Sequence, residues 1–435
     1  MTPLKCLIPK VTVVALSLGL AACNATFYTL GGSVSGLDSA ASLTLVEGGG
    51  ETLVLTANGD FSFARMFGNG TAYTVTVGTQ PNGETCNITN GSGIINATNV
   101  TNISVVCSPP TVSTLAGSTT YGSADGLGPA ASFYYPTGVV VDTSGNLYVA
   151  DTNNFEIRKI SPIGMVSTLA GSTTSGSADG IGGAAGFNYP TDVALSNDGA
   201  TLYVADSYNN EIRKIDLATG AVSTFAGSTT PGFVDGTGTA ASFHYPKGVK
   251  LDRNGNFYIA DFNNNAIRKI TPAGVVTTLA GSVTAGSADG VGSAASFNHP
   301  KGIAVDTNGN VYVGDVDNNE IRKITPAGVA TTLAGSTTAG SSDGIGTAAS
   351  FSAPKGVALS TDDTVLYVAD GNNEIRKIDL ATRMVTTLAG STTPGSTDGP
   401  AASASFNNPV GVATDALGNV YVGDTDNHEY RKITP

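Results

Sequence analysis

The sequence predicts an all-β protein, a six-bladed β-propeller preceded by a small β-sandwich. Three observations lead to this fold class. A unit of 54 to 56 residues occurs six times between residue 111 and the C-terminus. Each unit holds four short β-type runs, and radial repetition of a four-stranded unit is the blade pattern of a propeller. Residues 31–108 lack the repeat but carry alternating runs between Gly- and Asn-rich turns, as in a sandwich.

The period of the repeat is visible in the piece Thr-Leu-Ala-Gly, in which Phe replaces Leu once. Its third-from-last residue falls at Leu115, Leu169, Phe225, Leu279, Leu333 and Leu388. In the copy that begins at Phe297, the β-type runs cover residues 302–306, 310–315, 320–324 and 329–334. They are rich in Val, Ile, Tyr and Thr and are bounded by Gly, Asn, Asp or Pro, which predicts four antiparallel strands per blade.

The phase of the repeat predicts how the ring closes. The last copy ends at Pro435 without a fourth strand, whereas residues 111–116 form a fourth strand with no preceding three. We therefore expect residues 111–117 to complete the last blade, so that the propeller covers residues 111–435. Such closure removes the open edge that a sheet otherwise presents.

The strand motifs of the repeat resemble a known propeller family. The pieces are Gly302-Ile-Ala-Val-Asp306, Asn146-Leu-Tyr-Val-Ala-Asp151 and Asn318-Asn-Glu-Ile-Arg-Lys-Ile324. Together they look like the NHL repeat, and the resemblance covers residues 111–435. The sequence departs from the usual motif in placing Arg after Ile, and each copy inserts a loop such as residues 281–296.

The charges of the chain fall into a repeated pattern. Twelve of its 21 Lys and Arg residues are the six Arg-Lys pairs of the third strands. We expect each Arg, from Arg158 onward, to pair with the Asp that ends the second strand, the first being Asp151. The alternative is a ring of cations for a ligand. A net charge of −13 without a long basic run argues against nucleic-acid binding.

The N-terminus has the layout of a bacterial lipoprotein. Residues 1–22 combine Lys5 and Lys10 with a short apolar run, which predicts a signal peptide. The ending Leu20-Ala-Ala-Cys23 resembles a lipobox, and the resemblance implies palmitate and other acyl chains on Cys23, followed by a tether over 23–30. Asn24 after the Cys implies sorting to the outer membrane. The alternative is an ordinary signal peptide with an incidental Cys.

Residues 31–108 predict a small antiparallel β-sandwich, with runs at 43–46, 52–56, 73–77 and 103–106. The segment 31–37 is similar to modules at the N-termini of bacterial surface lipoproteins. Once Cys6 is removed and Cys23 is lipidated, Cys86 and Cys107 remain, and an oxidising compartment favours a disulfide between them. This bridge is worth roughly 3 kcal/mol on the chain-entropy model.

Positions that break the sixfold symmetry are the candidates for function. Each blade begins with a loop that ends in Phe-x-x-Pro, at the mouth of the central channel. The residues before Pro are Tyr135, Tyr189, Tyr245, His299, Ala353 and Asn408, and those after it are Thr137, Thr191, Lys247, Lys301, Lys355 and Val410. With His244, the Tyr, His and Lys members form an aromatic and basic arc. We interpret this arc as a site for an anionic or carbohydrate-like ligand. The alternative is that the Tyr side chains pack between blades and the Lys side chains are solvated.

Metal sites are a weaker interpretation. Every copy contains an Asp-Gly loop, in the form Ser-x-Asp-Gly in all but the third, with Asp at 125, 179, 235, 289, 343 and 398, which supplies oxygen ligands suited to Ca²⁺ but also forms an ordinary turn. The histidines His244, His299 and His428 allow a zinc site in principle. We predict no bound cofactor, with Ca²⁺ or Zn²⁺ as the alternative.

These observations favour a monomeric binding or scaffold protein, tethered to the cell surface by lipid, whose loop face takes a protein, carbohydrate or anionic ligand. The alternative is a metal-dependent lyase or hydrolase, because propellers similar to this one include lactonases and amidating lyases. We find no Ser/His/Asp or Cys/His constellation with informative spacing and assign no catalytic residue.

Overall fold

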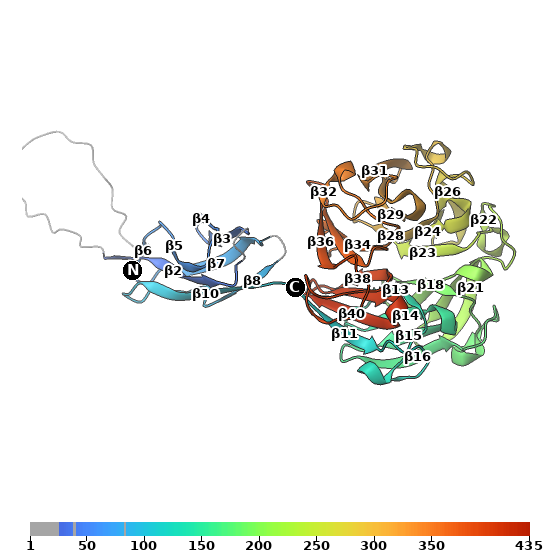
Figure 1. Ribbon diagram of the computed structural model, residues 1–435, viewed down its shortest axis with the longest axis horizontal. Helices are drawn as coiled ribbons and strands as arrows, with labels where there is room; N and C mark the ends of the chain where they lie inside the picture. The colour runs from blue at the N-terminus through green and yellow to red at the C-terminus, as the bar shows by residue number, and fades with distance from the viewer. Residues whose placement is uncertain (1–25, 38–40, 82–83) are drawn as a thin grey trace, which may run out of the picture. The chain divides into compact units, whose positions relative to one another are not determined.

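The computed structural model describes residues 26–37, 41–81 and 84–435. The signal segment 1–22 and the predicted lipidation of Cys23 lie outside the described residues. The chain separates into two compact units, residues 1–108 and 109–435 (Figure 1). The described residues form strands and short 3₁₀ turns, and they contain no helix long and apolar enough to cross a bilayer.

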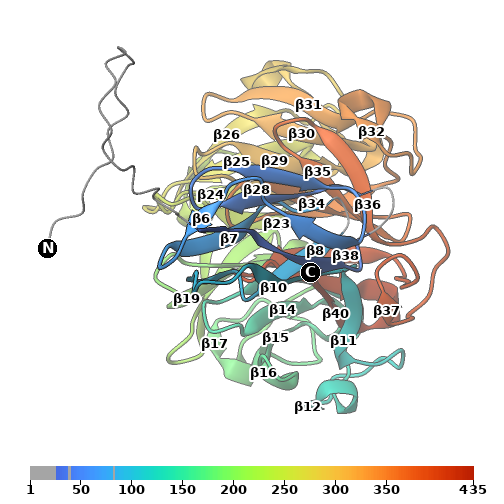
Figure 2. The ribbon, with the colours of Figure 1, turned by 90° about the vertical axis from the view of Figure 1, so that its left-hand side faces the viewer.

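The first unit is a β-sandwich, as predicted (Figures 1 and 2). One sheet has the order β5-β2-β10-β8, formed by Gly59–Ser62, Leu30–Ser35, Val100–Ser108 and Thr85–Thr89. The other has the order β4-β3-β7-β9, formed by Thr52–Leu55, Leu43–Glu47, Ala72–Thr79 and Ser92–Ile94. A small pair joins β1 (Phe27–Tyr28) to β6 (Phe67–Gly68), so strands already occur within the segment 23–30 expected to be a tether.

One detail of the sandwich prediction is wrong. β10 pairs with β2 in parallel, not antiparallel. These two strands are the first and last long strands of the unit. No tight turn joins them, so hairpin geometry does not fix their relative direction. The predicted disulfide is confirmed: Cys86 on β8 and Cys107 on β10 are register partners and are bonded.

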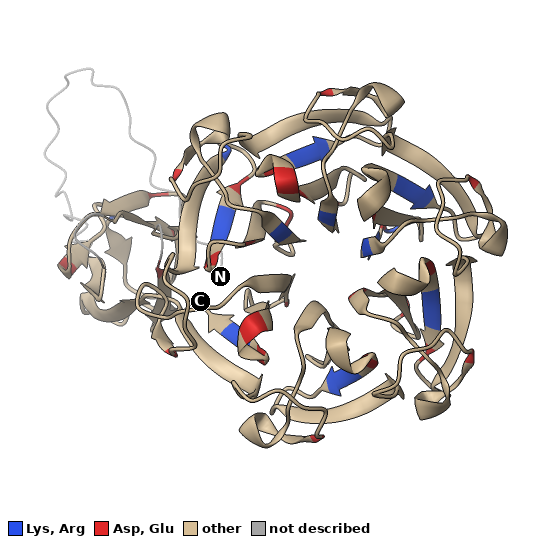
Figure 3. Cartoon of the chain, turned by 45° about the vertical axis from the view of Figure 1, so that its right-hand side comes forward, with Lys and Arg blue, Asp and Glu red and all other residues tan. Residues whose placement is uncertain are grey.

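The second unit consists of six five-stranded sheets around a central opening, a six-bladed propeller (Figure 3). The innermost strands contact their counterparts in neighbouring blades. They are β13 (Pro136–Val141), β18 (Pro190–Leu195), β23 (Pro246–Leu251), β28 (Pro300–Val305), β33 (Pro354–Leu359) and β38 (Pro409–Thr414). The second strands are β14 (Leu147–Asp151), β19 (Thr201–Asp206), β24 (Phe257–Asp261), β29 (Val311–Asp315), β34 (Val365–Asp370) and β39 (Val420–Asp424).

The outer part of each blade comprises three strands. The third strands are β15 (Glu156–Ile160), β20 (Glu211–Asp216), β25 (Ala266–Ile270), β30 (Glu320–Ile324), β35 (Glu374–Asp379) and β40 (Glu429–Thr434). The fourth are β16 (Met165–Gly171), β21 (Ala221–Gly227), β26 (Val275–Gly281), β31 (Val329–Gly335), β36 (Met384–Gly390) and β11 (Thr111–Gly117). The fifth are β12 (Gly126–Leu127), β17 (Gly180–Ile181), β22 (Gly236–Thr237), β27 (Gly290–Val291), β32 (Gly344–Ile345) and β37 (Gly399–Pro400).

The fifth strand corrects the prediction of four strands per blade. It arises from the inserted loop, whose two residues after Asp pair with the fourth strand, as Gly126 and Leu127 do with Val166 and Met165. A two-residue strand carries too little periodicity to be seen in the sequence. It covers the outer edge of the fourth strand and so shortens the exposed backbone that another chain can pair with.

The sixth sheet joins the two ends of the propeller. β11, from the start of the unit, pairs antiparallel with β40, from its end, between Thr111↔Thr434 and Gly117↔Glu429. Ala401 N also donates to Pro110 O at 2.8 Å. The sheet therefore contains one strand contributed from 300 residues away in the sequence, which converts six sheets into a closed ring.

Short 3₁₀ turns occupy two repeated places. One group follows the fifth strand: η1 (Gly128–Ala130), η3 (Gly182–Ala184), η5 (Gly238–Ala240), η7 (Gly292–Ala294) and η9 (Gly346–Ala348). The other follows the second strand: η2 (Thr152–Asn154), η4 (Ser207–Asn209), η6 (Phe262–Asn264), η8 (Val316–Asn318) and η10 (Thr425–Asn427). The second group lies next to the loop that ends in Phe-x-x-Pro, and these two loops together form the candidate site.

Candidate functional site at the channel mouth

A buried ion-pair network holds the loops of the site in every blade. In the first blade, Arg158 on β15 is fully buried, and its Nη1 donates to Asp151 Oδ2 at 2.7 Å. Its Nη2 donates to Asp125 Oδ1, also at 2.7 Å. We call this set of one Arg and two Asp the arginine clamp. The clamps of the other blades are centred on Arg213, Arg268, Arg322, Arg376 and Arg431.

The clamp settles two of the sequence interpretations. The expected pairing of Arg with the Asp of the second strand is confirmed, with Nη1–Oδ2 distances of 2.7 to 3.4 Å across the six blades. A ring of arginines facing a ligand is wrong, because all six side chains are fully buried. The Asp of the Asp-Gly loop accepts from Arg Nη2 at 2.6 to 2.8 Å, a role that neither the calcium nor the turn interpretation foresaw.

The clamp also fixes the loop at the channel mouth. Asp151 Oδ1 accepts from the backbone N–H of Tyr134 at 2.7 Å, and its Oδ2 accepts from Asn154 Nδ2 at 2.8 Å. Asn154 Nδ2 in turn donates to Gly122 O at 2.6 Å. One buried carboxylate thus connects the turn after the second strand to the loop before the first strand. Burial raises the pKa of Asp151 to about 6, against the opposing effect of Arg158.

A second carboxylate lies beside the clamp in five of the six blades. Glu320 Oε2 is buried without a hydrogen-bond partner and lies 3.8 Å from Arg322 Nη1. Burial raises the pKa of Glu320 to about 7, and the neighbouring Asp315 and Asp289 add to the rise while Arg322 opposes it. The third blade has Ala266 at this position, so the fold does not require the Glu.

The residue before each Pro adopts a left-handed backbone conformation. The φ angles of these six residues lie between 50° and 56°, a region that side chains such as Tyr and His rarely occupy. In most blades an Asn of the preceding blade supports the conformation, as when Asn210 Oδ1 accepts from Tyr245 N at 3.0 Å. His428 Nδ1 takes this role toward Tyr135 N. The backbone is thus set by the repeat, and only the side chains differ between blades.

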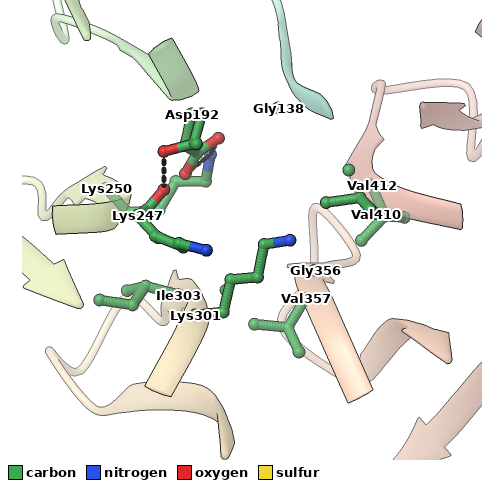
Figure 4. A pocket seen from close by; sticks show the side chains of 13 residues that line it. Gly138, Asp192, Lys247, Lys250, Lys301, Ile303, Gly356, Val357, Val410 and Val412 are labelled. Carbon is green, nitrogen blue, oxygen red and sulfur yellow. Dashed lines mark hydrogen bonds and ion pairs between the residues drawn. The ribbon is translucent and has the colours of Figure 1, made fainter. Parts of the chain in front are cut away.

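Three lysines predicted from the sequence meet at the channel. Lys247, Lys301 and Lys355 extend from the innermost strands β23, β28 and β33, and all three are half-buried. In Figure 4, Lys247 and Lys301 extend into the same opening. Burial lowers the pKa of all three, and it lowers the pKa of Lys301 well below the ordinary value, with the charges of Lys247 and Lys355 adding to the effect.

The three lysines differ in their partners. Lys247 Nζ lies 3.9 Å from the ring centroid of Phe262, a cation–π contact. Lys355 Nζ donates to Asn408 Oδ1. Lys301 Nζ makes no hydrogen bond or ion pair with any of the residues that the structure describes. The alternative interpretation, in which these lysines are solvated, is therefore wrong for Lys247 and Lys355, because both have specific protein partners.

The channel also contains an acidic residue that is not among the predicted site residues. Five innermost strands carry Gly two residues after Pro, where a Cβ atom meets the backbone of the next blade. At Gly302, for example, it lies 2.2 Å from Lys355 O. The second blade has Asp192 instead. Its carboxylate lies 3.4 Å from Lys250 Nζ, and its Oδ2 accepts from Val249 N at 3.0 Å.

Lys250 breaks the repeat as well, since the equivalent positions hold Ala or Val: Val140, Ala194, Ala304, Ala358 and Ala413. Aligning the six copies beyond the residues that flank Pro would have found both partners. Burial raises the pKa of Asp192. Asp192, Lys247, Lys250 and Lys301 line a channel cavity of about 30 Å³, which has room for about two water molecules.

Aromatic side chains run along the rim beside the lysines. The ring of Tyr208, which is 48% exposed, lies 4.5 Å from Tyr189 and 4.6 Å from Tyr245, centroid to centroid. Phe155 packs edge-on against Tyr189 at 5.1 Å. We call Phe155, Tyr189, Tyr208 and Tyr245 the aromatic arc. It brings together two predicted residues, but it depends on Tyr208 and Phe155, which replace residues of the repeat in the turn after the second strand.

The other predicted aromatic residues form separate groups. Tyr135 belongs to a cluster with Tyr134 and His428, whose rings lie 5.3 and 5.0 Å from it. His299 stacks on Phe262 at 4.4 Å, and its Nδ1 lies 2.6 Å from Asp317 Oδ2.

The three histidines are engaged apart from one another. His244 Nε2 lies 3.2 Å from Asn263 Nδ2, His299 pairs with Asp317, and His428 accepts from Tyr135 N. Within residues 26–37, 41–81 and 84–435, no three His, Cys, Asp or Glu side chains are grouped as a metal site requires. The zinc alternative therefore has no ligand set in the part of the chain that the structure describes.

Sequence families match three parts of the propeller. Residues 139–285 match the SMP-30/Gluconolactonase/LRE-like region, residues 284–345 the Teneurin NHL domain, and residues 406–429 the NHL repeat. Two of these models are of NHL type, and both match within the propeller. This outcome confirms the resemblance seen in the strand motifs.

Curated relatives share the repeat region. The chain is 34% identical over 278 residues to Protein SUPPRESSOR OF QUENCHING 1, chloroplastic, of Arabidopsis thaliana. The aligned region covers 60% of this chain and 26% of the relative. It is 29% identical over 345 residues to NHL repeat-containing protein 2 of Homo sapiens, covering 70% of this chain and 47% of the relative. The chain thus spans less than half the length of these relatives.

Solved structures from Bacteroides share the fold over nearly the whole chain. A structural genomics protein of unknown function from Bacteroides thetaiotaomicron has a TM-score of 0.62 at 20% identity, covering 95% of this chain and 98% of that protein. An auxiliary nutrient binding protein from the same organism has a TM-score of 0.59 at 15% identity, covering 94% and 98%. One from Bacteroides ovatus has a TM-score of 0.58 at 17% identity, covering 95% and 98%. At these identities the likeness concerns the fold.

The raised carboxyl pKa values predict that the NHL propeller is more stable in mild acid. The folded state binds a proton at Glu320 up to about pH 7, whereas the ordinary pKa of 4.5 applies on unfolding. This stabilisation is fully present below pH 4.5 and disappears as the pH rises through 7. Glu156 and Glu429, whose pKa values also rise to about 7, act in the same direction. Thermal unfolding should therefore give a higher midpoint at pH 5 than at pH 8.

The variant Glu320→Gln tests the origin of this pH dependence. Gln reproduces the shape of the protonated Glu, so we expect a higher midpoint than wild type at pH 8 and a smaller change between pH 5 and 8. Asp198→Asn, which removes one charge from an exposed turn whose hydrogen bond from Ser196 keeps the carboxyl pKa below its ordinary value, should keep the wild-type pH dependence between pH 5 and 8. Equal pH dependence in wild type and Glu320→Gln would show that the buried Glu is not responsible.

Proposed function

We propose that this protein is a cell-surface binding protein whose NHL propeller takes a small anionic ligand, or the anionic end of a larger one, at the mouth of its channel. The observation that carries the proposal is the convergence of Lys247, Lys301 and Lys355 on one opening. The repeat does not require these lysines, because the same positions in the other blades are Thr137, Thr191 and Val410. Three cations with lowered pKa values gain free energy when a carboxylate or phosphate neutralises them.

The aromatic arc supports a ligand with a flat or sugar-like portion beyond its anionic group. Its rings lie on blades one to three, and the lysines lie on blades three to five, so that Tyr245 and Lys247 meet on the third blade. A sugar ring places C–H groups against an aromatic face, and a small cavity excludes all but the charged end. An acidic sugar or a related carboxylated metabolite suits both the aromatic arc and the lysines.

The names of the Bacteroides structures agree with a binding role, since two are auxiliary nutrient binding proteins. We place the protein on the outer membrane as a monomer, anchored through acyl chains on Cys23, with no nucleic-acid partner. The match of residues 139–285 to the gluconolactonase-like family keeps a metal-dependent lyase or hydrolase as a second candidate. That candidate needs a metal-ligand set, and the described residues group none.

The channel lysines can be tested by titrating galacturonate, pyruvate and inorganic phosphate into the protein in a calorimeter at low ionic strength. The variant Lys247→Ala/Lys301→Ala/Lys355→Ala should bind the best of these probes at least about tenfold more weakly than wild type. The matched control is Lys159→Ala/Lys269→Ala/Lys323→Ala. It removes the same charge from third strands, where each Lys lies over a Tyr ring at 5.4 to 5.6 Å. Undiminished binding by the channel variant, or equal loss in the control, would contradict the proposal.

The lipid anchor is tested separately. Protein expressed with residues 1–22 should sediment with outer membranes and enter solution only with detergent, because several acyl chains hold a protein firmly. The Cys23→Ser variant should carry no lipid label. Wild-type protein that is free of label and stays in solution after removal of membranes would exclude the anchor.

A further inference from the structure

The four lysines that line the channel are not equivalent. Lys250 pairs with Asp192, Lys247 lies on Phe262, and Lys355 donates to Asn408. Lys301 makes no hydrogen bond or ion pair with the described residues, although it lies in the middle of the group, with Lys247 and Lys355 on the neighbouring blades. Its amine is therefore the one that a ligand reaches without displacing a protein partner.

The surroundings of Lys301 favour the neutral amine. Burial in the narrow channel lowers its pKa well below the ordinary value, and the charges of Lys247 and Lys355 lower it further. A desolvated lysine next to other cations is the arrangement that makes an amine nucleophilic at neutral pH.

The channel around Lys301 contains the other groups that a carbonyl reaction needs. Lys247 and Lys355 flank Lys301 and can hold a carboxylate by charge. Asp192 lines the same cavity as Lys301 and pairs there with Lys250, so its carboxylate can accept a proton and return it during the reaction (Figure 4). The cavity of about 30 Å³ admits only a few atoms, which matches the carbonyl end of a small molecule.

We propose that Lys301 captures a small 2-oxo acid as a reversible imine. The inference deepens the proposed function, because it rests on the same lysine cluster and names a ligand class. The lone pair of Lys301 Nζ forms a bond to the carbonyl carbon as the C=O π bond breaks, and Asp192 transfers one proton from the nitrogen to the resulting alkoxide, which gives a neutral carbinolamine. Nitrogen then releases a proton to Asp192, the hydroxyl leaves as water with a returned proton, and a C=N bond forms. No oxidant or reductant is consumed.

Reductive trapping on the full chain tests this reaction. We expect pyruvate with sodium cyanoborohydride at pH 7 to label Lys301 at least about tenfold faster than any other lysine, as peptide mass mapping would show. Lys301→Arg keeps the positive charge but not the nucleophile and should lose the label, whereas Lys269→Arg, on a third strand, should keep it. Even labelling across all lysines of the wild-type protein would overturn the inference without any variant.

Lactate, which has the carboxylate of pyruvate but no ketone, separates this inference from the proposed function. If lactate and pyruvate bind equally in calorimetry and no adduct forms, the imine is wrong and the anion site stands. If neither binds, no adduct forms, and galacturonate and phosphate also fail to bind, both proposals fail. A selective Lys301 adduct, with pyruvate binding more tightly than lactate, supports both.

Discussion

The buried guanidinium of the third strand is the interaction on which the rest of the propeller depends. Taking Arg158 and Asp151 out of water costs several kcal/mol per ion, and an ion pair offsets that cost only when its remaining hydrogen-bonding groups are satisfied. Here they largely are: Arg158 also bonds Asp125 and two backbone carbonyls, and Asp151 accepts from Tyr134 N and Asn154. The planar fork of Arg suits this bridge between two carboxylates, and a Lys would reach only one of them.

Because each clamp joins the inserted loop to the second strand, the residue before each Pro has the same backbone conformation in all six blades, although the turn after the second strand is one residue shorter in the fifth blade. The side chains there are then free to differ without altering the fold. Three lysines, one Asp and the aromatic arc use that freedom on one part of the ring. One position on the innermost strand is less free to vary. The other five blades have Gly there, where neighbouring strands approach closely, and only the second blade has a side chain, that of Asp192.

The regular parts of this structure could be predicted from the sequence, and the irregular ones could not. The Arg–Asp151 pair follows from adjacent strands of known register, and the Cys86–Cys107 bridge follows from elimination. Asp125 lies 33 residues before Arg158 in a turn-like loop, so nothing local indicates that the two meet. The fifth strand is too short to show a period. Tyr208 and Lys250 can be recognised as departures from the repeat only when every position of the six copies is compared. That they lie close to the predicted site follows only from the closed ring, which brings neighbouring blades together.

The claim that the clamps hold the rim in place is tested most directly by native-state hydrogen exchange. In each clamp, the Asp that ends the second strand accepts from one backbone amide of the loop before the first strand. These amides belong to Tyr134, Asn188, His244, Asn298, Ser352 and Asn407. We predict that all six exchange as slowly as the central strands, with opening free energies close to that of global unfolding. Exchange at the rate of ordinary surface loops would contradict the account, because the rim would then move independently of the clamps.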